Sequence, residues 1–456
     1  MRRHVIIGRY GAGDRGHLPL DEGEVATRLD LVAGESTLDY GIGQALADLK
    51  RLGVYPSEIG VDVLILAAHV HAADTRVSRS SQSQDGWTRE IRLVVPVADP
   101  DRWTSVVPTL VRMLNFLTGD RWSLTFRARP RRFALIAQTS PPRLDALRYD
   151  DVALFSGGLD SLIGTIDALE TGRTPLLLSH AGEGATSNAQ STIYNTLKEQ
   201  YRTRPFERLR LWMAFPNGLV SGSGGERTTR GRSFLFFALG VFAGTGLNGP
   251  FTLKVPENGF IAVNVPLDPL RLGALSTRTT HPFYIARWND VLQGLVVNGR
   301  IENPYWDKTK GEMVAACANG PLLRSLISSS LSCAAPTKGR WHGIGTQHCG
   351  YCLPCLIRRA ALAAGLRPDP DPTVYTVEDL TARALDTSQS EGAQIRSFQL
   401  AIQRLRARPE LASIFIHKPG PLFDQSSARQ AAIGDVYRRG LEEVGALLNG
   451  VRSRPA

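Results

Sequence analysis

Short apolar runs alternate with helical patterns along the first 140 residues. The runs have the length of buried strands, and the segments between them place apolar residues at helical spacing. The stretch Thr139–Pro142 contains two prolines and marks the end of this part. We therefore expect residues 1–140 to form an N-terminal α+β domain, with strands at 4–7, 91–97 and 122–127 and helices at 40–52, 61–73 and 104–117.

The central part of the chain repeats strand, loop and helix more regularly. This alternation is typical of a doubly wound parallel sheet, in which helices cover both faces. Beyond the prolines of 368–372 the pattern becomes helical to the end. The sequence thus predicts an α/β domain over 148–370 and a helical C-terminal region over 371–456. The α/β strands are expected at 152–155, 176–178, 209–215 and 251–255, and its helices at 162–169, 193–201 and 234–242.

A glycine-rich loop follows the first strand of this α/β domain and opens its first helix. The loop reads Ser156-Gly157-Gly158-Leu159-Asp160-Ser161. Glycines let the backbone approach a ligand, the helix N-terminus adds partial positive charge, and the two serines can donate hydroxyl hydrogen bonds. Since a simple capped turn does not need two glycines and two serines around an acid, the loop predicts a phosphate site. It lacks the Gly-Lys-Ser/Thr ending of a Walker A loop.

A cysteine cluster is the second strong signal. The run Cys349-Gly-Tyr-Cys352-Leu-Pro-Cys355 can form a tight knuckle, and Cys333 can supply the fourth thiolate of a tetrahedral zinc site. Such a site leaves no position for water, so the zinc is predicted to be structural. His342 and His348 are alternatives for one ligand. Cys317 is expected to be a core residue. Disulfides are disfavoured, because the cysteines are clustered in a large chain without a signal-peptide pattern.

The loop resembles the PP-loop of the ATP pyrophosphatase superfamily, whose members cleave ATP to AMP and pyrophosphate to adenylate a substrate. Together with the knuckle, it resembles the 7-cyano-7-deazaguanine synthase family, QueC, and more closely the QueC-like QatC proteins of bacterial Qat anti-phage systems. This resemblance covers about residues 151–366. The segments that carry the closer similarity are Thr229–Phe236, Pro256–Gly259, Ser276–Pro282, Thr309–Met313 and His348–Arg359.

Three residues are candidates for catalysis. Asp160 stands within the loop, where it needs a metal ion or a nucleotide hydroxyl as partner, because a carboxylate repels phosphate. Arg232 precedes the apolar helix 234–242, and its guanidinium can bind a carboxylate or a phosphate with two hydrogen bonds. Lys310 matches the Thr-Lys-x-Glu segment of the family, which implies that it reaches the ATP phosphates. Without that resemblance, both Arg232 and Lys310 could be solvated surface residues.

Two further segments are candidates for binding the substrate. Glu257 and Asn258 follow the strand 251–255, and they could bind the amino or amide edge of a purine-like base, although a plain turn explains Pro, Asn and Gly almost as well. Arg278, Thr280 and His281 offer donors suited to a carboxylate or a phosphate. They are equally compatible with a polar surface loop that caps a helix.

The resemblance implies a ligase that uses ATP with Mg²⁺ and a structural Zn²⁺. A carboxylate of the 7-carboxy-7-deazaguanine type attacks the α-phosphate of ATP, and an amine then displaces AMP. Ammonia gives the amide, and a second adenylation gives the nitrile. The chain departs from the family at Ser179–Ser187, where the synthases have a Tyr-Gly-Gln-type segment. The final product therefore stays open, and an amine of a protein partner from a defence operon is an alternative acceptor.

Composition bears on partners and location. A hydrophobic content of 43% and a charged content of 21% are ordinary for a globular protein, and no apolar run approaches the ~20 residues of a membrane helix. We expect a cytoplasmic protein without membrane contact. The net charge of +10 favours anionic partners, for which ATP suffices. The basic run Arg127–Arg132 keeps a PP-loop RNA-modifying enzyme as an alternative, and a non-catalytic adaptor subunit of a defence complex is another.

Overall fold

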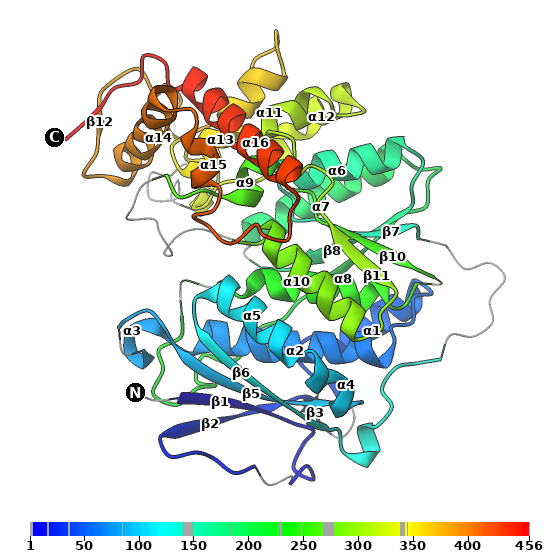
Figure 1. Ribbon diagram of the computed structural model, residues 1–456. Coiled ribbons are helices and arrows are strands. Elements are labelled where there is room, and N and C mark those ends of the chain that lie inside the picture. The colour runs from blue at the N-terminus through cyan, green and yellow to red at the C-terminus, as the bar shows by residue number, and fades with distance from the viewer. Residues whose placement is uncertain are drawn as a thin grey trace.

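The computed structural model contains two large parallel β-sheets, of four and five strands, and two small two-stranded sheets, with helices between and around the large ones (Figure 1). It describes residues 3–15, 18–34, 37–83, 85–139, 149–182, 184–226, 228, 230–247, 249–267, 278–337, 343 and 345–455. The expected boundary at 140–148 lies outside these residues, as do Thr229, Ser276 and His342. Among the described helices, none combines the length and the apolar character needed to cross a membrane.

The N-terminal sheet has the strand order β2-β1-β5-β6, and every pairing in it is parallel. The prediction of an α+β domain is therefore wrong, and this part is α/β. Helices α4 and α5 form the crossover between the parallel neighbours β5 and β6, and helices α1 to α3 connect β2 to β5 on the other side of β1. The elements are β1 Arg3–Arg9, β2 Glu24–Asp30, β3 Val32–Ala33, β4 Thr37–Leu38, α1 Ile42–Arg51, α2 Glu58–Arg76, α3 Arg79–Gln82, β5 Glu90–Val97, α4 Pro100–Ser105, α5 Val107–Thr118, β6 Arg121–Ala128 and the 3₁₀ turn Arg131–Phe133.

The central sheet has the strand order β11-β10-β7-β8-β9, and it too is parallel throughout. This confirms the parallel sheet that the sequence predicts. The chain starts in the middle with β7, moves outward to β9, and returns to the other side with β10. The strand order reverses between β7 and β10. The elements are β7 Asp151–Leu154, α6 Leu159–Glu170, β8 Pro175–His180, α7 Gly184–Gln200, β9 Glu207–Leu211, α8 Arg232–Gly244, β10 Phe251–Lys254, α9 Gly259–Val263, α10 Pro282–Gly294 and β11 Gly299–Glu302.

The two sheets share one hydrophobic core. Helices α2, α5, α8 and α10 lie between them (Figure 1), and a single cluster of buried apolar residues runs from Ile6 of β1 to Leu253 of β10. Helix α2 is buried on every side from Gly60 to Asp74, as expected for a helix in the interior of a large core. The N-terminal part is thus packed directly onto the central sheet.

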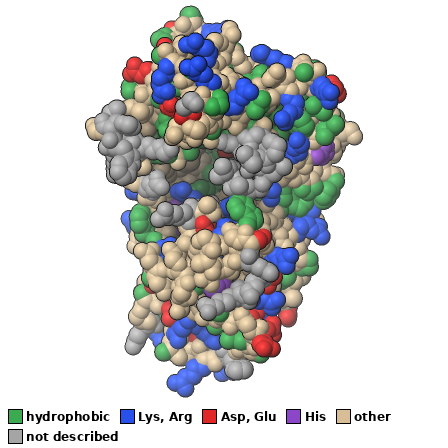
Figure 2. All heavy atoms as spheres, turned by 90° about the vertical axis from the view of Figure 1, so that its left-hand side faces the viewer, with side chains coloured by type: hydrophobic (Ala, Val, Ile, Leu, Met, Phe, Trp, Pro, Cys, Tyr) green, Lys and Arg blue, Asp and Glu red, His purple; other side chains and the backbone are tan. Residues whose placement is uncertain are grey.

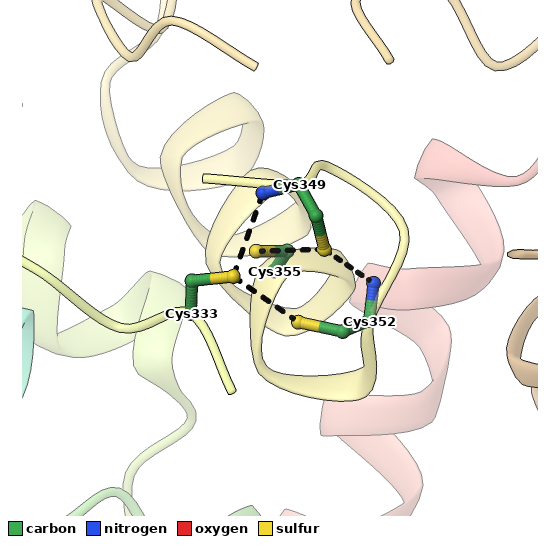
Figure 3. A group of neighbouring side chains, drawn as sticks. All are labelled: Cys333, Cys349, Cys352 and Cys355. Carbon is green, nitrogen blue, oxygen red and sulfur yellow. Dashed lines mark hydrogen bonds between the residues drawn. The ribbon is translucent and has the colours of Figure 1, made fainter. Parts of the chain in front are cut away.

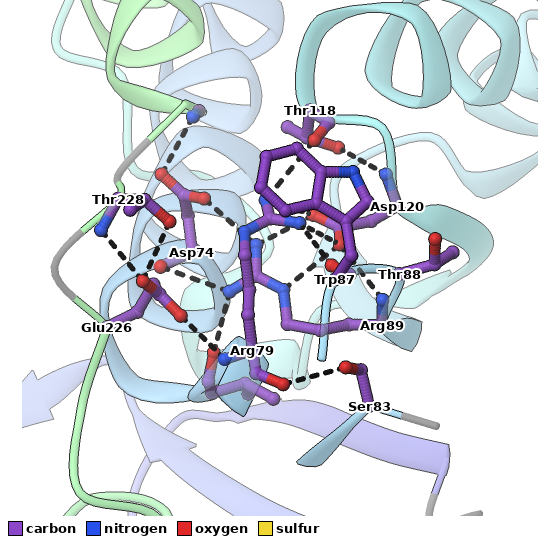
Figure 4. Close-up of polar contacts among 12 residues, drawn as sticks. Asp74, Arg79, Ser83, Trp87, Thr88, Arg89, Thr118, Asp120, Glu226 and Thr228 are labelled. Carbon is purple, nitrogen blue, oxygen red and sulfur yellow. Dashed lines mark hydrogen bonds and ion pairs between the residues drawn. The ribbon is translucent and has the colours of Figure 1, made fainter. Parts of the chain in front are cut away.

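A buried ionic network fixes the start of α8 (Figure 4). Arg89 is fully buried, and its guanidinium donates to the carboxylates of Asp120, at 2.7 Å, and Asp74, at 3.0 Å. Arg79 donates to Asp120 as well. The other oxygen of Asp74 accepts from the backbone N–H of Gly231 at 2.7 Å. Since Gly231 immediately precedes α8, the N-terminal part holds the segment that presents Arg232.

Helices of the C-terminal region pack against the helix that follows the cysteine knuckle. One core cluster joins Leu356 of α13, Phe398 of α14 and Tyr437 of α16. The predicted helical character is seen in α14 to α16. Residues 371–389 contain no helix, and the short strands β12 and β13 are a further exception. The elements are α11 Lys310–Ala315, α12 Gly320–Leu326, the 3₁₀ turn Ile327–Ser329, α13 Leu353–Gly365, β12 Leu385–Asp386, α14 Ser390–Ala407, α15 Leu411–Phe415, α16 Ser427–Leu447 and β13 Ser453–Arg454.

Candidate functional site

A cavity of 560 Å³ opens beside the glycine-rich loop. The loop follows β7, and Glu257 follows β10, so both lie at the carboxyl ends of the two strands between which the strand order reverses. Ligands of doubly wound sheets bind at this point. Loop residues Ser156, Gly158 and Asp160 line the cavity together with Glu257 and Lys310. With Leu159 of the loop and Cys352 of the knuckle, seven predicted site residues from four separate segments therefore line one cavity.

The loop needs glycine at position 157. Gly157 has φ +78°, a conformation that side chains disfavour, and a Cβ atom there would lie 3.0 Å from the backbone nitrogen of Gln190. The hydroxyl of Ser156 accepts from the N–H of Gly158 at 3.3 Å and lies 3.1 Å from the hydroxyl of Ser161. Gly158 is the N-cap residue of α6, and as a glycine it offers no side chain to accept a hydrogen bond from the first amides of this helix. The serines thus hold the loop shape at the open start of the helix.

Asp160 is the centre of a buried polar cluster. Its Oδ1 lies 2.9 Å from Nζ of Lys310, and its Oδ2 accepts from the side-chain amide of Asn258 at 2.8 Å and from its backbone N–H at 3.2 Å. Burial alone would raise the pKa of Asp160, but Lys310 and the hydrogen bonds from Glu257 and Asn258 hold that pKa below its usual value. Asp160 is therefore a carboxylate paired with a cation at the edge of the cavity.

Glu257 has the opposite protonation behaviour. Burial and the neighbouring charge of Asp160 raise the pKa of Glu257 well above its usual value, and its carboxyl group hydrogen-bonds to Asp160. One proton is thus shared within a pair of carboxyl groups next to Lys310. Asn258 is fully buried, and its Oδ1 caps α9 by accepting from the N–H of Ile261 at 3.0 Å. Its side chain holds Asp160 and Glu257 in place.

Four cysteines converge at the knuckle (Figure 3), and one of them, Cys352, lines the cavity. The sulfur atoms of Cys333, Cys349, Cys352 and Cys355 all lie within 4.8 Å of one another. Cys333 and Cys352 are 3.9 Å apart, and Cys349 and Cys355 are 3.8 Å apart. Tetrahedral zinc with Zn–S bonds of ~2.3 Å places its sulfur ligands about 3.8 Å from one another. The cluster therefore fits one zinc ion.

One short segment connects the cysteine cluster to the phosphate loop. The N–H of Leu331 donates to the carbonyl oxygen of Gly157 at 2.9 Å, and two residues later the chain supplies Cys333. Between them, the N–H of Ser332 donates to Nε2 of His348 at 3.2 Å. His348 therefore supports this segment beside the four sulfurs, whereas the other alternative ligand, His342, lies outside the described residues.

Arg358 is a site residue that the sequence analysis did not single out. It is fully buried on α13, and it donates to the hydroxyl of Ser330 at 2.8 Å and to the carbonyl oxygen of Ile327 at 2.7 Å. It thereby ties the helix after the knuckle to the segment that touches the phosphate loop. The sequence pointed to Arg358 only through its place in the motif His348–Arg359. Its role was not predictable, because its hydrogen-bond partners lie about thirty residues away in the chain.

Arg232 lies at the carboxyl end of β8, away from the residues that line the cavity. A Cβ atom on Gly182 would lie 3.0 Å from a guanidinium nitrogen of Arg232 and 3.9 Å from Nδ1 of His180. Burial, reinforced by the charge of Arg232, lowers the pKa of His180 to about 4, so this imidazole is neutral at pH 7. Gln190 links this group to the loop, since its amide donates to the carbonyl oxygen of Ser156 at 3.3 Å.

The structure places Arg278, Thr280 and His281 in a different part of the molecule. Nδ1 of His281 accepts from the N–H of Phe283 and caps α10, and Arg278 donates to the carbonyl oxygen of Phe116 on α5. Thr280 lines a separate cavity of 400 Å³. None of the three is among the described residues that line the cavity at the phosphate loop.

Two arginines of the basic run Arg127–Arg132 form ion pairs within the protein. Arg127 pairs with Asp14, and Arg129 pairs with Glu58 and Asp62 in the interior. Lys and Arg side chains are instead gathered at the top of the face in Figure 2, which is hollowed between its upper and lower parts. Arg129 is thus buried, and Arg127 is partly exposed but paired, which leaves fewer free charges for the RNA alternative.

No protein-family model and no curated protein matches this chain. The class of protein therefore rests on fold and site alone. The chain is an α/β protein with two parallel sheets and a four-cysteine cluster that can hold zinc.

Proposed function

We propose that this protein is a QueC-like PP-loop ligase that cleaves ATP to AMP and pyrophosphate and joins a 7-carboxy-7-deazaguanine-like carboxylate to an amine. By its resemblance to QatC, we place this activity in a bacterial anti-phage defence system. The observation that carries the proposal is the single cavity in which the loop Ser156–Ser161, Lys310 and the Asp160–Glu257 pair meet. A loop of this composition at the reversal point of a parallel sheet suits a nucleotide phosphate.

In this proposal the phosphates of ATP lie on the loop amides, and Lys310 contributes a positive charge beside them. A carboxylate oxygen of the substrate attacks the α-phosphorus, the bond to pyrophosphate breaks, and an acyl adenylate forms. The amine nitrogen then attacks the acyl carbon, AMP leaves with the electrons of the C–O bond, and the nitrogen loses a proton. Asp160 and Glu257 are the acidic side chains among the described residues that line the cavity. With the phosphate oxygens, they would hold a magnesium ion that offsets the phosphate charge, and Glu257 would give up the shared proton when it binds the ion.

Pyrophosphate release from ATP tests this proposal. Wild-type protein, Asp160→Ala and the matched control Asp150→Ala are each incubated with ATP, ammonia and one candidate carboxylate, beginning with 7-carboxy-7-deazaguanine. Asp150 is exposed and lies outside the cavity lining. We expect carboxylate-dependent release by the wild type and the control, and loss of release in Asp160→Ala. Equal release without a carboxylate, or undiminished release by Asp160→Ala, contradicts the proposed chemistry.

The acceptor is tested by mass spectrometry. A protein amine would retain the acyl group, so a partner protein incubated with enzyme, ATP and the carboxylate gains the mass of the acyl group, whereas ammonia yields a free small molecule. The absence of added mass on candidate partners, together with formation of the free amide, assigns ammonia as the acceptor.

A further inference from the structure

The cavity continues beyond the phosphate loop into an end with a different character. There it is lined by Val265 and Leu267, which follow α9, and by Tyr351 and Leu353 of the cysteine knuckle. Ser390 and Gln394 form a third wall. They belong to the first turns of α14, in the C-terminal region that lies beyond the part of the chain with family resemblance. The cavity thus has a charged end at the loop and an apolar end with two polar side chains.

The C-terminal region is fixed to the site at a second, independent place. The hydroxyl of Thr309 and the N–H of Gly311, the latter at 3.3 Å, donate to Glu443 of α16. These two residues flank Lys310. In the same helix Arg439 pairs with Glu312. Because α14 and α16 share a core with α13, the wall formed by α14 cannot move independently of the site.

The position of the apolar end indicates which ligand it takes. In doubly wound folds, a nucleotide whose phosphates lie on the first loop has its ribose at the carboxyl end of the next strand, which here is β8. The cavity extends to the other flank, past Glu257 after β10 and toward the knuckle. The space beyond the phosphates is therefore available to the second substrate. An apolar wall suits a flat uncharged ring, and an amide and a hydroxyl can pair with donors and acceptors at its edge.

We propose that α14 completes the site for the carboxylate substrate, and that Ser390 and Gln394 determine its specificity for a planar heterocycle with an amide or amino edge. This inference rests on the proposed function, because it takes the ATP site as given. It assigns to the C-terminal region a direct role in substrate binding.

Calorimetric titration separates the two ligands. Full-length wild type, Ser390→Ala and Gln394→Leu are titrated with the α,β-methylene analogue of ATP, and then with 7-carboxy-7-deazaguanine in the presence of that analogue. Arg396→Ala is the control, since Arg396 lies on the same helix but is exposed and outside the lining. We expect each of the first two variants to weaken carboxylate binding about tenfold through a lost hydrogen bond, with the affinity for the ATP analogue unchanged.

Three outcomes overturn this inference. In the first, the variants bind the carboxylate as tightly as the wild type does. In the second, they lose as much affinity for the ATP analogue as for the carboxylate, which would place adenosine in the apolar end. In the third, the wild type does not bind the carboxylate. Thermal unfolding at the wild-type temperature shows that the variants are folded. Failure of the proposed function gives a different result. The wild type would then bind the carboxylate, and Gln394→Leu would weaken that binding, but the wild type would release no pyrophosphate from ATP.

Discussion

Replacing Lys310 by methionine tests the charge arrangement beside the phosphate loop. The Lys310 and Asp160 side chains are 9% and 8% exposed, and their charged atoms are 2.9 Å apart. Removing the cation leaves a buried carboxylate, and breaking a buried ion pair costs roughly 3–5 kcal/mol. Asn258 still donates two hydrogen bonds to Asp160, and Glu257 shares its proton. We therefore expect a loss near the lower limit, about 3 kcal/mol of unfolding free energy.

A double-mutant cycle isolates the interaction between the two charges. Asp160→Asn combined with Lys310→Met leaves no uncompensated charge, so the double variant should be more stable than Lys310→Met alone. Urea unfolding of the four proteins at pH 7.5 gives the coupling energy, and Lys308→Met is the matched control on the neighbouring surface. Since Lys310 keeps the pKa of Asp160 below its usual value, the stabilisation is complete above about pH 4 and is lost as the pH falls through the folded-state pKa.

Two results would refute this reasoning. The first is a loss below about 1 kcal/mol in Lys310→Met, which is the value of an exposed ion pair. The second is a coupling energy within about 0.5 kcal/mol of zero, which is the scatter of independent sites. Either result would mean that Asp160 is not a buried anion held by Lys310.

Three other predictions concern separate parts of the molecule. Because the pKa of Glu257 is raised, the free energy of unfolding of the wild type should fall as the pH rises from about 4.5 through that pKa. Glu257→Gln should lack this fall in urea unfolding, and parallel pH curves for the two proteins would contradict the prediction. Cys355→Ser should lose bound zinc in atomic absorption and melt at a lower temperature, whereas Cys317→Ser should keep both, and equal zinc content refutes the site. Asp120→Asn weakens the partner of buried Arg89 and should cost about 3 kcal/mol in urea unfolding; a loss under 1 kcal/mol contradicts a tight network.

The sequence predicted which segments form the fold better than how they pair. Regular alternation of apolar strands and helices indicated the parallel central sheet correctly. In the N-terminal part, β2 was missed because it is an edge strand in which only Leu29 and Thr27 are buried. Without β2, the parallel order β2-β1-β5-β6 could not be inferred. Strand direction depends on contacts between distant segments, which periodicity does not contain.

For the candidate site, local chemistry was predictable and long-range chemistry was not. The glycine-rich loop Ser156–Ser161 and the four cysteines that can hold zinc were recognisable from residue type and spacing, and the structure brings the four sulfur atoms together. For Arg278, Thr280 and His281 the sequence left open a ligand role and a polar loop that caps a helix. The structure contains a cap, and its N-cap residue is His281. Gln394 and Glu443 gave no signal, because α14 and α16 are ordinary amphipathic helices that reach the site only through tertiary contacts. The bond between Gly311 and Glu443, for example, joins residues 132 positions apart.

The same contacts explain why this chain needs parts beyond the sheet that carries the loop. Gly157 has a left-handed backbone conformation, and the segment that bonds to it, at Leu331, leads directly to the cysteine cluster through Cys333. A metal ion held by the four cysteines would fix that segment on one side, and Arg358 fixes it on the other. Lys310 is likewise held from behind, through Glu443. The loop and the lysine are therefore positioned by elements that follow the sheet in sequence. Their geometry thus depends on the folding of the C-terminal half.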